Sequence, residues 1–237
     1  MQIELEKTPK SPTIIGGFPG VGLVGTIAAG FLIEHLNAKS IGRMNSKKIQ
    51  PVIAIHQGKV VEPLEIYYDK KNNIVIINAL SNIKDVEWDL SEAIIDLAKK
   101  VGAKEIINLE GIASNNPLTT PQTYYYTSDS KRTKQLEKLE RIKQLKEGVA
   151  IGVTAALMLN AKKVPYTSIF VETHSEMPDS RAAAKLIETL DQMLGLKVDY
   201  KPLIKKAEEF EKKLKSILQQ SKTVINKKQQ KELDYFG

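Results

Sequence analysis

The sequence has no cysteine among its 237 residues. This absence excludes a disulfide framework, a zinc or iron–sulfur site with cysteine ligands and a catalytic thiol. The longest apolar stretch near the N-terminus, at 21–33, is too short and glycine-rich to cross a bilayer and is followed by Glu34 and His35. The charged residues that follow Met1 are not those of a secretory signal peptide. We therefore expect a cytoplasmic protein without a membrane partner.

Motifs with a known chemistry are also scarce. The sequence lacks a P-loop, a Gly-x-Ser-x-Gly nucleophile elbow and a His-Glu-x-x-His zinc motif. His174 lies between Glu172 and Glu176, and these three side chains would share one face of an extended strand. Such a trio could bind a divalent metal, but a hydrogen-bond cluster at the end of a strand is the interpretation we favour. We expect no metal, no cofactor and no catalytic residue.

Positive charge is concentrated towards the C-terminus. The formal net charge is +7, and residues 201–237 carry ten lysines against five acidic residues, so residues 1–200 are nearly neutral. None of the ten cations is an arginine, the residue best suited to bidentate phosphate contacts. A solvated helix face therefore explains the lysines better than a nucleic-acid-binding arm. We divide the chain into a core domain, 1–200, and a lysine-rich helical tail, 201–237.

Alternating strand and helix patterns predict a layered α/β core domain. The apolar run at 74–79 is typical of a central strand. Asp89 and Glu92 have the spacing of a capping box and predict a helix that ends at Gly102. Residues 131–147 are densely charged, and we expect them to be helical or exposed. The predicted strands are 13–18, 40–44, 52–56, 64–68, 74–79, 105–109, 124–127 and 166–173, and the predicted helices are 23–36, 89–102, 148–159 and 179–194.

A glycine-rich loop connects the first predicted strand to the first predicted helix. Gly20, Gly22 and Gly25 match the Gly-x-Gly-x-x-Gly fingerprint of dinucleotide-binding loops, in which a phosphate lies at the N-terminus of the helix. The next predicted strand does not end in the acidic residue that would bind a ribose hydroxyl. These glycines are therefore a possible ligand loop, although tight packing of the strand against the helix is the interpretation we favour.

The tail combines a helical seam with an apolar end. Apolar residues recur with heptad spacing from Leu203 to Val224, and this seam could pack on its own body or on a sister chain. The polar segment at 226–232 has nothing to bury, yet Leu233, Tyr235 and Phe236 follow it. Two adjacent aromatic rings beside the terminal carboxylate of Gly237 could dock on a partner or fold back onto the body. Spacing alone favours neither alternative.

Three stretches of the core domain resemble the archaeal members of the proteasome assembly chaperone family, which is related to the second eukaryotic assembly chaperone. They are Gly16-Gly17-Phe18-Pro19-Gly20-Val21-Gly22-Leu23-Val24-Gly25, Glu147-Gly148-Val149-Ala150-Ile151-Gly152-Val153-Thr154 and Val171-Glu172-Thr173-His174-Ser175-Glu176-Met177-Pro178-Asp179. The resemblance implies a three-layer α/β/α sandwich similar to purine nucleoside phosphorylases. It also implies a homo-oligomer that helps to assemble, or docks on, the α-ring of the proteasome.

The docking signal of that family is a C-terminal tripeptide of a hydrophobic residue, a tyrosine and any residue, which inserts between α-subunits. By position, Tyr235 takes the hydrophobic place, Phe236 the tyrosine place and Gly237 the last place. Phe236 departs from this pattern because it lacks the hydroxyl group. The sequence thus predicts a non-enzymatic chaperone or adaptor that binds proteasome α-subunits through Leu233, Tyr235, Phe236 and Gly237. The alternative is a nucleoside- or nucleotide-binding enzyme that uses the loop from Gly20 to Gly25.

Overall fold

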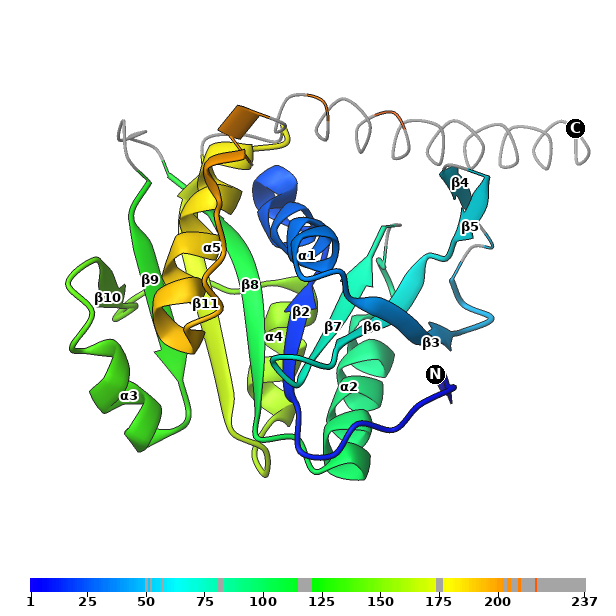
Figure 1. Cartoon of the computed structure of the whole chain (residues 1–237). Coiled ribbons are helices and arrows are strands. Elements are labelled where there is room, and N and C mark those ends of the chain that lie inside the picture. The colour runs from blue at the N-terminus through cyan, green and yellow to red at the C-terminus, as the bar shows by residue number, and fades with distance from the viewer. Residues whose placement is uncertain are drawn as a thin grey trace, which may run out of the picture.

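A nine-stranded sheet forms the centre of the computed structural model, which describes residues 1–49, 51, 53–56, 58–80, 83–114, 121–173, 177–202, 204–205, 209 and 216 (Figure 1). In spatial order the strands are β1 (Gln2–Leu5), β3 (Lys39–Asn45), β6 (Leu64–Asp69), β7 (Ile74–Ala79), β2 (Thr13–Gly17), β8 (Glu105–Ala113), β11 (Tyr166–Thr173), β9 (Thr123–Thr127) and β10 (Ile142–Gln144). The four central strands, β7, β2, β8 and β11, are parallel to one another. Strands β6 and β9 flank these four and run antiparallel to them.

Helices cover both faces of the sheet. Helices α1 (Val24–His35) and α5 (Ser180–Leu194) pack together on one face, and α2 (Glu87–Val101) and α4 (Gly152–Asn160) pack together on the other (Figure 1). The alternation of strand side chains divides the core accordingly: in β2, Ile15 joins the cluster under α1 and α5, whereas Ile14 joins the cluster under α2 and α4. The expected layered α/β fold is confirmed.

The central strands are the part of the fold that the sequence predicts best. Strand β7 is buried at all six positions, as its apolar run predicts for a strand covered on both faces. Strand β11 spans Tyr166–Thr173, the predicted range. Helix α5 begins where Asp179 caps it, because the carboxylate of Asp179 accepts a hydrogen bond of 2.9 Å from the backbone N–H of Ala182.

The predicted capping box at the start of α2 is wrong. The helix begins two residues earlier, at Glu87, and its N-cap is Val86 rather than Asp89. The carboxylate of Asp89 accepts a hydrogen bond of 2.7 Å from Lys48 instead. Glu87 and Asp89 both lie in the first turn, where acidic side chains interact favourably with the helix dipole.

The edges of the sheet differ most from the sequence-based prediction. Strands β1 and β10 were not predicted, because they have only four and three residues. The predicted helix at 148–159 begins only at Gly152, after an exposed segment that includes Val149 and Ile151. The charged stretch at 131–147 forms helix α3 (Ser130–Leu136) and then β10.

A separate two-stranded hairpin lies beside the sheet. It consists of β4 (Ala54–His56) and β5 (Lys59–Val61), which pair with each other and not with the nine-stranded sheet. The predicted strand at 52–56 corresponds to β4, and Val52 lies outside the described residues. Ile55 and Val60 face each other across the hairpin and are 73% and 57% exposed. This hairpin therefore presents an apolar surface to solvent.

Few residues of the tail are described. Lys201, Pro202, Ile204, Lys205, Glu209 and Ser216 are helical and exposed, and most of the predicted heptad seam lies outside the described residues. In the part of the chain that the structure describes, no helix has the length and apolar character needed to span a membrane.

One ion pair ties helix α3 to the start of β8. The carboxylate of Glu105 is 5% exposed and accepts hydrogen bonds from both Nε and Nη2 of Arg132. Thr167 on β11 donates a further hydrogen bond of 2.6 Å to the same carboxylate. Removing only the cation would leave a buried negative charge without its countercharge.

We therefore expect Arg132→Ala to lower the free energy of unfolding by about 3 kcal/mol. Arg141→Ala is the matched control, because the Arg141–Glu188 pair has an arginine side chain that is 68% exposed. Its loss should cost less than about 1 kcal/mol. Urea denaturation of the three proteins measures both values. Equal losses for the two variants would contradict a stabilising role of the Glu105–Arg132 pair.

Candidate functional site

The glycine-rich loop lies where β2 ends at the carboxyl edge of the central parallel strands. A short 3₁₀ turn, η1 (Val21–Leu23), connects β2 to α1. Gly22 and Leu23 both have left-handed backbone conformations, with φ of 64° and 50°. For Gly22 this conformation is without steric cost, whereas most other residues would be strained there. In open α/β sheets this edge is the usual place for a ligand.

Protein atoms fill the space beside the three predicted loop glycines. A methyl group on Gly20 would overlap the carboxylate of Glu110, and one on Gly25 would overlap the backbone carbonyl of Leu109. A methyl group on Gly22 would lie 2.5 Å from Oγ1 of Thr173. Close packing of the loop against β8 and β11 thus accounts for glycine at all three positions.

The carboxylate of Glu110, near the end of β8, is the centre of a hydrogen-bond network. Thr154 on α4 donates from Oγ1 to Oε2 of Glu110 over 2.7 Å, and the backbone N–H of Gly111 donates to Oε1 over 3.2 Å. The backbone N–H of Val21 donates to the same carboxylate. One side chain thereby connects the glycine loop, β8 and α4.

Glu110 is placed to exchange a proton near neutral pH. Burial raises the pKa of its carboxyl group to about 7, although the hydrogen bonds from Thr154, Gly111 and Val21 lower it. Its negative charge lies at the first backbone N–H of η1, close to where a dinucleotide phosphate would lie in a loop of this kind. A phosphate bound there would have to displace the carboxylate or be repelled by it.

Two buried amides flank the end of β2, and one of them joins this network. Nδ2 of Asn108 donates to Oγ1 of Thr154 over 2.8 Å. Asn108 on β8 pairs with Gly16 and Asn78 on β7 pairs with Gly17, so the two amides flank the end of β2. Among the described residues, the Oδ1 atoms of both asparagines are buried without a hydrogen-bond partner. Such atoms are uncommon in folded proteins.

Sequence reasoning identified the glycines but missed Glu110, Asn108 and Thr154. The only sequence signal for Glu110 is its position directly after a buried apolar strand. Its carboxylate accepts a hydrogen bond from Thr154, which is 44 residues away in the sequence. No spacing rule connects two residues so far apart.

Only one member of the acidic and histidine trio is described. Glu172 accepts a hydrogen bond of 2.9 Å from the hydroxyl of Tyr124, whereas His174 and Glu176 lie outside the described residues. The described ranges contain no group of three or more histidine or acidic side chains that could hold a metal ion. The partner-binding residues Leu233, Tyr235, Phe236 and Gly237 also lie outside the described residues.

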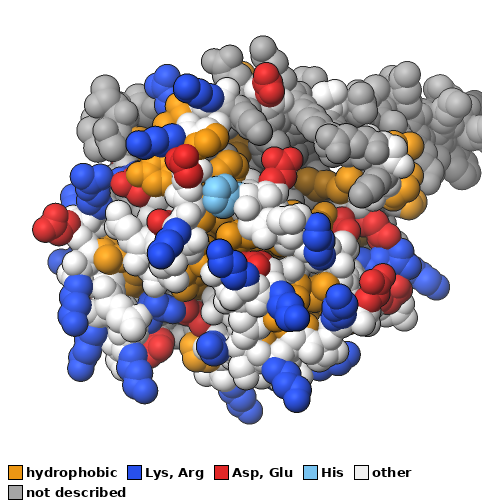
Figure 2. Space-filling view, in the orientation of Figure 1, with side chains coloured by type: hydrophobic (Ala, Val, Ile, Leu, Met, Phe, Trp, Pro, Cys, Tyr) orange, Lys and Arg blue, Asp and Glu red, His pale blue; other side chains and the backbone are white. Residues whose placement is uncertain are grey.

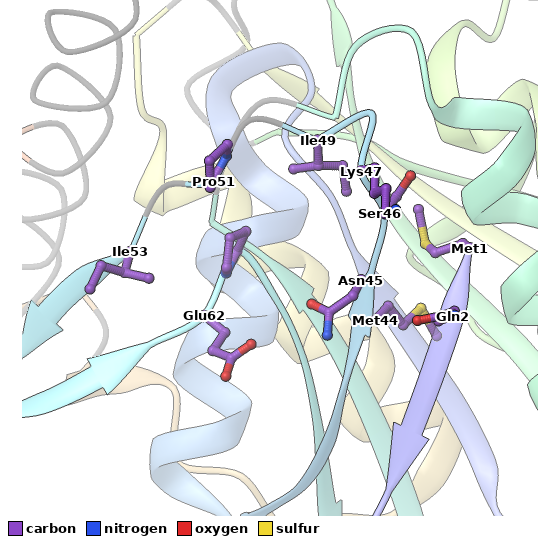
Figure 3. A pocket seen from close by; sticks show the side chains of 11 residues that line it. Met1, Gln2, Met44, Asn45, Ser46, Lys47, Ile49, Pro51, Ile53 and Glu62 are labelled. Carbon is purple, nitrogen blue, oxygen red and sulfur yellow. The ribbon is translucent and has the colours of Figure 1, made fainter.

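A cavity of about 720 Å³ lies at the other side of the molecule, between the end of β3 and the hairpin (Figure 3). Its walls include the apolar side chains of Met1, Met44, Ile49 and Ile53, with Glu62 at one side. The carboxylate of Glu62 is held by Arg43 at 2.6 Å and is therefore not an unpaired charge. The cavity combines these apolar walls with the polar side chains of Gln2, Asn45, Ser46 and Lys47.

The pKa of Glu110 predicts how stability depends on pH. The folded state, with a pKa of about 7, holds this proton more tightly than the unfolded chain, whose glutamate titrates near 4.5. The free energy of unfolding should therefore fall as the pH rises from 4.5 to 7, by about 3 kcal/mol. Glu110→Gln should lose this slope, as measured by urea denaturation across the pH range.

Glu147→Gln is the control for this experiment, because Glu147 is exposed and should leave the slope unchanged. If Glu110→Gln keeps the full dependence of the free energy of unfolding on pH, a group other than Glu110 takes up the proton.

Comparisons with known proteins agree with this architecture. The chain is 33% identical to Pyrococcus furiosus PbaA, described as an archaeal homolog of proteasome-assembly chaperone, with a TM-score of 0.84 over 94% of this chain and 99% of that one. It is 28% identical over 220 residues to an uncharacterized protein of Methanocaldococcus jannaschii. This alignment covers 92% of this chain and 90% of the other protein. Pyrococcus furiosus PbaB, described as an archaeal proteasome activator, has the same fold at 22% identity, with a TM-score of 0.75 over 91% of this chain and 98% of that one.

The model of the PAC2 family matches residues 14–218, a range that includes the glycine loop, all four central strands and the start of the tail. The resemblance found in the sequence is thereby confirmed, and the chain belongs to the PAC2 family.

Proposed function

We propose that this protein is a proteasome assembly chaperone or adaptor that binds the α-ring of the core particle through its C-terminal tail. The observation that carries the proposal is the likeness to PbaA, a homolog of a proteasome-assembly chaperone, over nearly the whole length of both chains. The likeness includes the core domain and the start of the tail rather than one motif. A role connected with the proteasome is therefore the simplest function for this chain.

The site around Glu110 supports a structural rather than a catalytic role for the body. The carboxylate accepts hydrogen bonds from three segments of the chain, and protein atoms fill the space beside the loop glycines. A catalytic base, by contrast, needs room for the substrate within hydrogen-bond reach. We therefore propose that the protein is not an enzyme and that the network fixes the shape of the body.

Docking through the tail would rest on Leu233, Tyr235, Phe236 and Gly237. The aromatic rings would fill apolar pockets between α-subunits, while the terminal carboxylate meets a lysine. Phe236 lacks the hydroxyl of the family signal, which should weaken docking by about 1–3 kcal/mol if a buried partner is left without its hydrogen bond. Several tails on one homo-oligomer would offset this loss through their effective concentration.

The alternative function is a nucleoside- or nucleotide-binding enzyme. The proton that Glu110 can exchange near pH 7, next to a glycine-rich loop, is the observation that favours it. A nucleotide at 100-fold its dissociation constant should then stabilise the fold by about 2.7 kcal/mol. Thermal unfolding with nucleosides, nucleotides and phosphate tests this alternative, and an unchanged melting temperature with all of them would remove it.

The immobilised full-length protein should capture purified archaeal proteasome α-rings. A variant that lacks residues 233–237 should not capture them. Phe236→Ala should reduce capture without lowering the melting temperature, because an exposed end contributes little to the stability of the body. The control is Gln230→Ala in the preceding polar segment, which should bind like the unaltered protein.

Equal capture by the full-length and truncated proteins would show that the tail is not the docking element. A fall in melting temperature on Phe236→Ala would show instead that the terminus packs on its own body.

A further inference from the structure

Nine lysines meet at the amino ends of the central parallel strands, opposite the glycine loop. They come from four segments that the structure describes completely: residues 6–12 before β2, 69–73 at the end of β6 and in the turn to β7, 99–104 at the end of α2 and in the turn to β8, and 161–165 between α4 and β11. All nine lysines are exposed. They are Lys7, Lys10, Lys70, Lys71, Lys99, Lys100, Lys104, Lys162 and Lys163, and we call this surface the lysine end.

The lysine end is strongly basic. Its four segments contain nine lysines and only two acidic residues, Glu6 and Asp69, which gives a balance of +7. Residues 201–237 add +5, so the remaining residues carry a net negative charge. Figure 2 shows Lys and Arg side chains along the lower rim, the end at which β8 and β11 begin in Figure 1. Solubility requires charge but not its collection at one end.

Backbone hydrogen bonds hold three of the segments against one another. The N–H of Lys104 donates to the carbonyl of Pro12 over 2.9 Å, and the N–H of Ser11 donates to the carbonyl of Val101 over 2.8 Å. The side chain of Asn73 donates to the carbonyl of Lys10 over 3.1 Å. The fourth segment joins them through Ile106, whose N–H donates to the carbonyl of Pro165 over 2.9 Å. The lysines thus project from a fixed base.

Of the acidic side chains near this base, Asp69, Glu105 and Asp96 are already engaged, whereas Glu6 is exposed. Asp69 is buried and accepts hydrogen bonds from the N–H groups of Lys71 and Asn72. Glu105 is neutralised by Arg132. Asp96 pairs with Lys99 at 3.2 Å. The other lysines of this surface form no ion pair among the described residues. Their charges repel one another, and an anionic partner would relieve this repulsion.

The chemistry of the surface favours an acidic polypeptide over a nucleic acid. None of the four segments contains an arginine, the residue of choice for phosphate and base contacts, or an aromatic side chain on which a base could stack. None of the exposed large hydrophobic side chains lies in them either. Lysines are flexible point charges that can meet carboxylates at irregular spacings.

We propose that the lysine end is a docking surface for an acidic segment of a partner protein. It lies away from the start of the tail, because the orange segment that follows α5 runs to the top of Figure 1, opposite the lower rim. The two ends can therefore be occupied at the same time. This inference rests on the described residues alone and does not depend on docking through the tail.

The test is binding of fluorescein-labelled decaglutamate to the full-length protein, followed by fluorescence anisotropy at low ionic strength, where screening is weak. Lys104→Glu combined with Lys163→Glu should weaken binding by about tenfold, because each change removes an attraction and adds a repulsion. Lys143→Glu combined with Lys146→Glu is the matched control, since both lysines are exposed at the other end of the sheet and line a cavity there. The control should stay within about twofold of the unaltered protein.

A single-stranded oligonucleotide of equal charge and label completes the experiment. We expect it to bind no more tightly than decaglutamate, and the melting temperatures of both variants should match that of the unaltered protein. If the two pairs of substitutions weaken the binding of decaglutamate equally, or if decaglutamate does not bind, the lysine end contributes only to solubility and the proposal is wrong. Tighter binding of the oligonucleotide would assign the lysine end to nucleic acid and overturn the proposal.

Discussion

The carboxylate of Glu110 sets the arrangement of three segments that are distant in the sequence. It accepts hydrogen bonds from the loop before α1, from the backbone of β8 and from Thr154 on α4, so each segment is positioned by the other two. The same carboxylate lies against Gly20, where any side chain would collide with it. The carboxylate of Glu110 therefore requires glycine at position 20, and the loop resembles a nucleotide fingerprint because close packing demands glycine at three positions with the same spacing.

The two ends of the sheet have opposite character. At the carboxyl end lie the glycine loop, the carboxylate of Glu110 and two amide oxygens without a hydrogen-bond partner among the described residues. At the amino end, the exposed side chains are mainly lysines, on loops and on the last turn of α2. The two ends of the body therefore offer surfaces of different chemistry.

Sequence reasoning succeeded where local patterns determine structure. The apolar run of β7 and the helical pattern of α5 depend on neighbouring residues, and both elements were predicted correctly. Sequence reasoning failed where residues that are distant in the sequence determine the local structure. Asp89 has the spacing of a cap, yet Lys48, which is 41 residues away, pairs with it and the helix begins earlier. Glu110 has no local signature, because its neighbours are brought to it by the fold. The lysine end was likewise hidden, since its residues are spread over most of the core domain.

The β4–β5 hairpin is structurally independent of the sheet that carries the rest of the molecule. Its strands pair only with each other, and Gly58 at its turn has a φ of 73° and no heavy atom within 4 Å of the place where a side chain would begin. Additional residues at this turn would shift no strand of the main sheet out of register. The turn is thus a natural point at which to attach a fluorophore or an affinity peptide, and a chain without native cysteines allows that label to be placed by thiol chemistry at a single site.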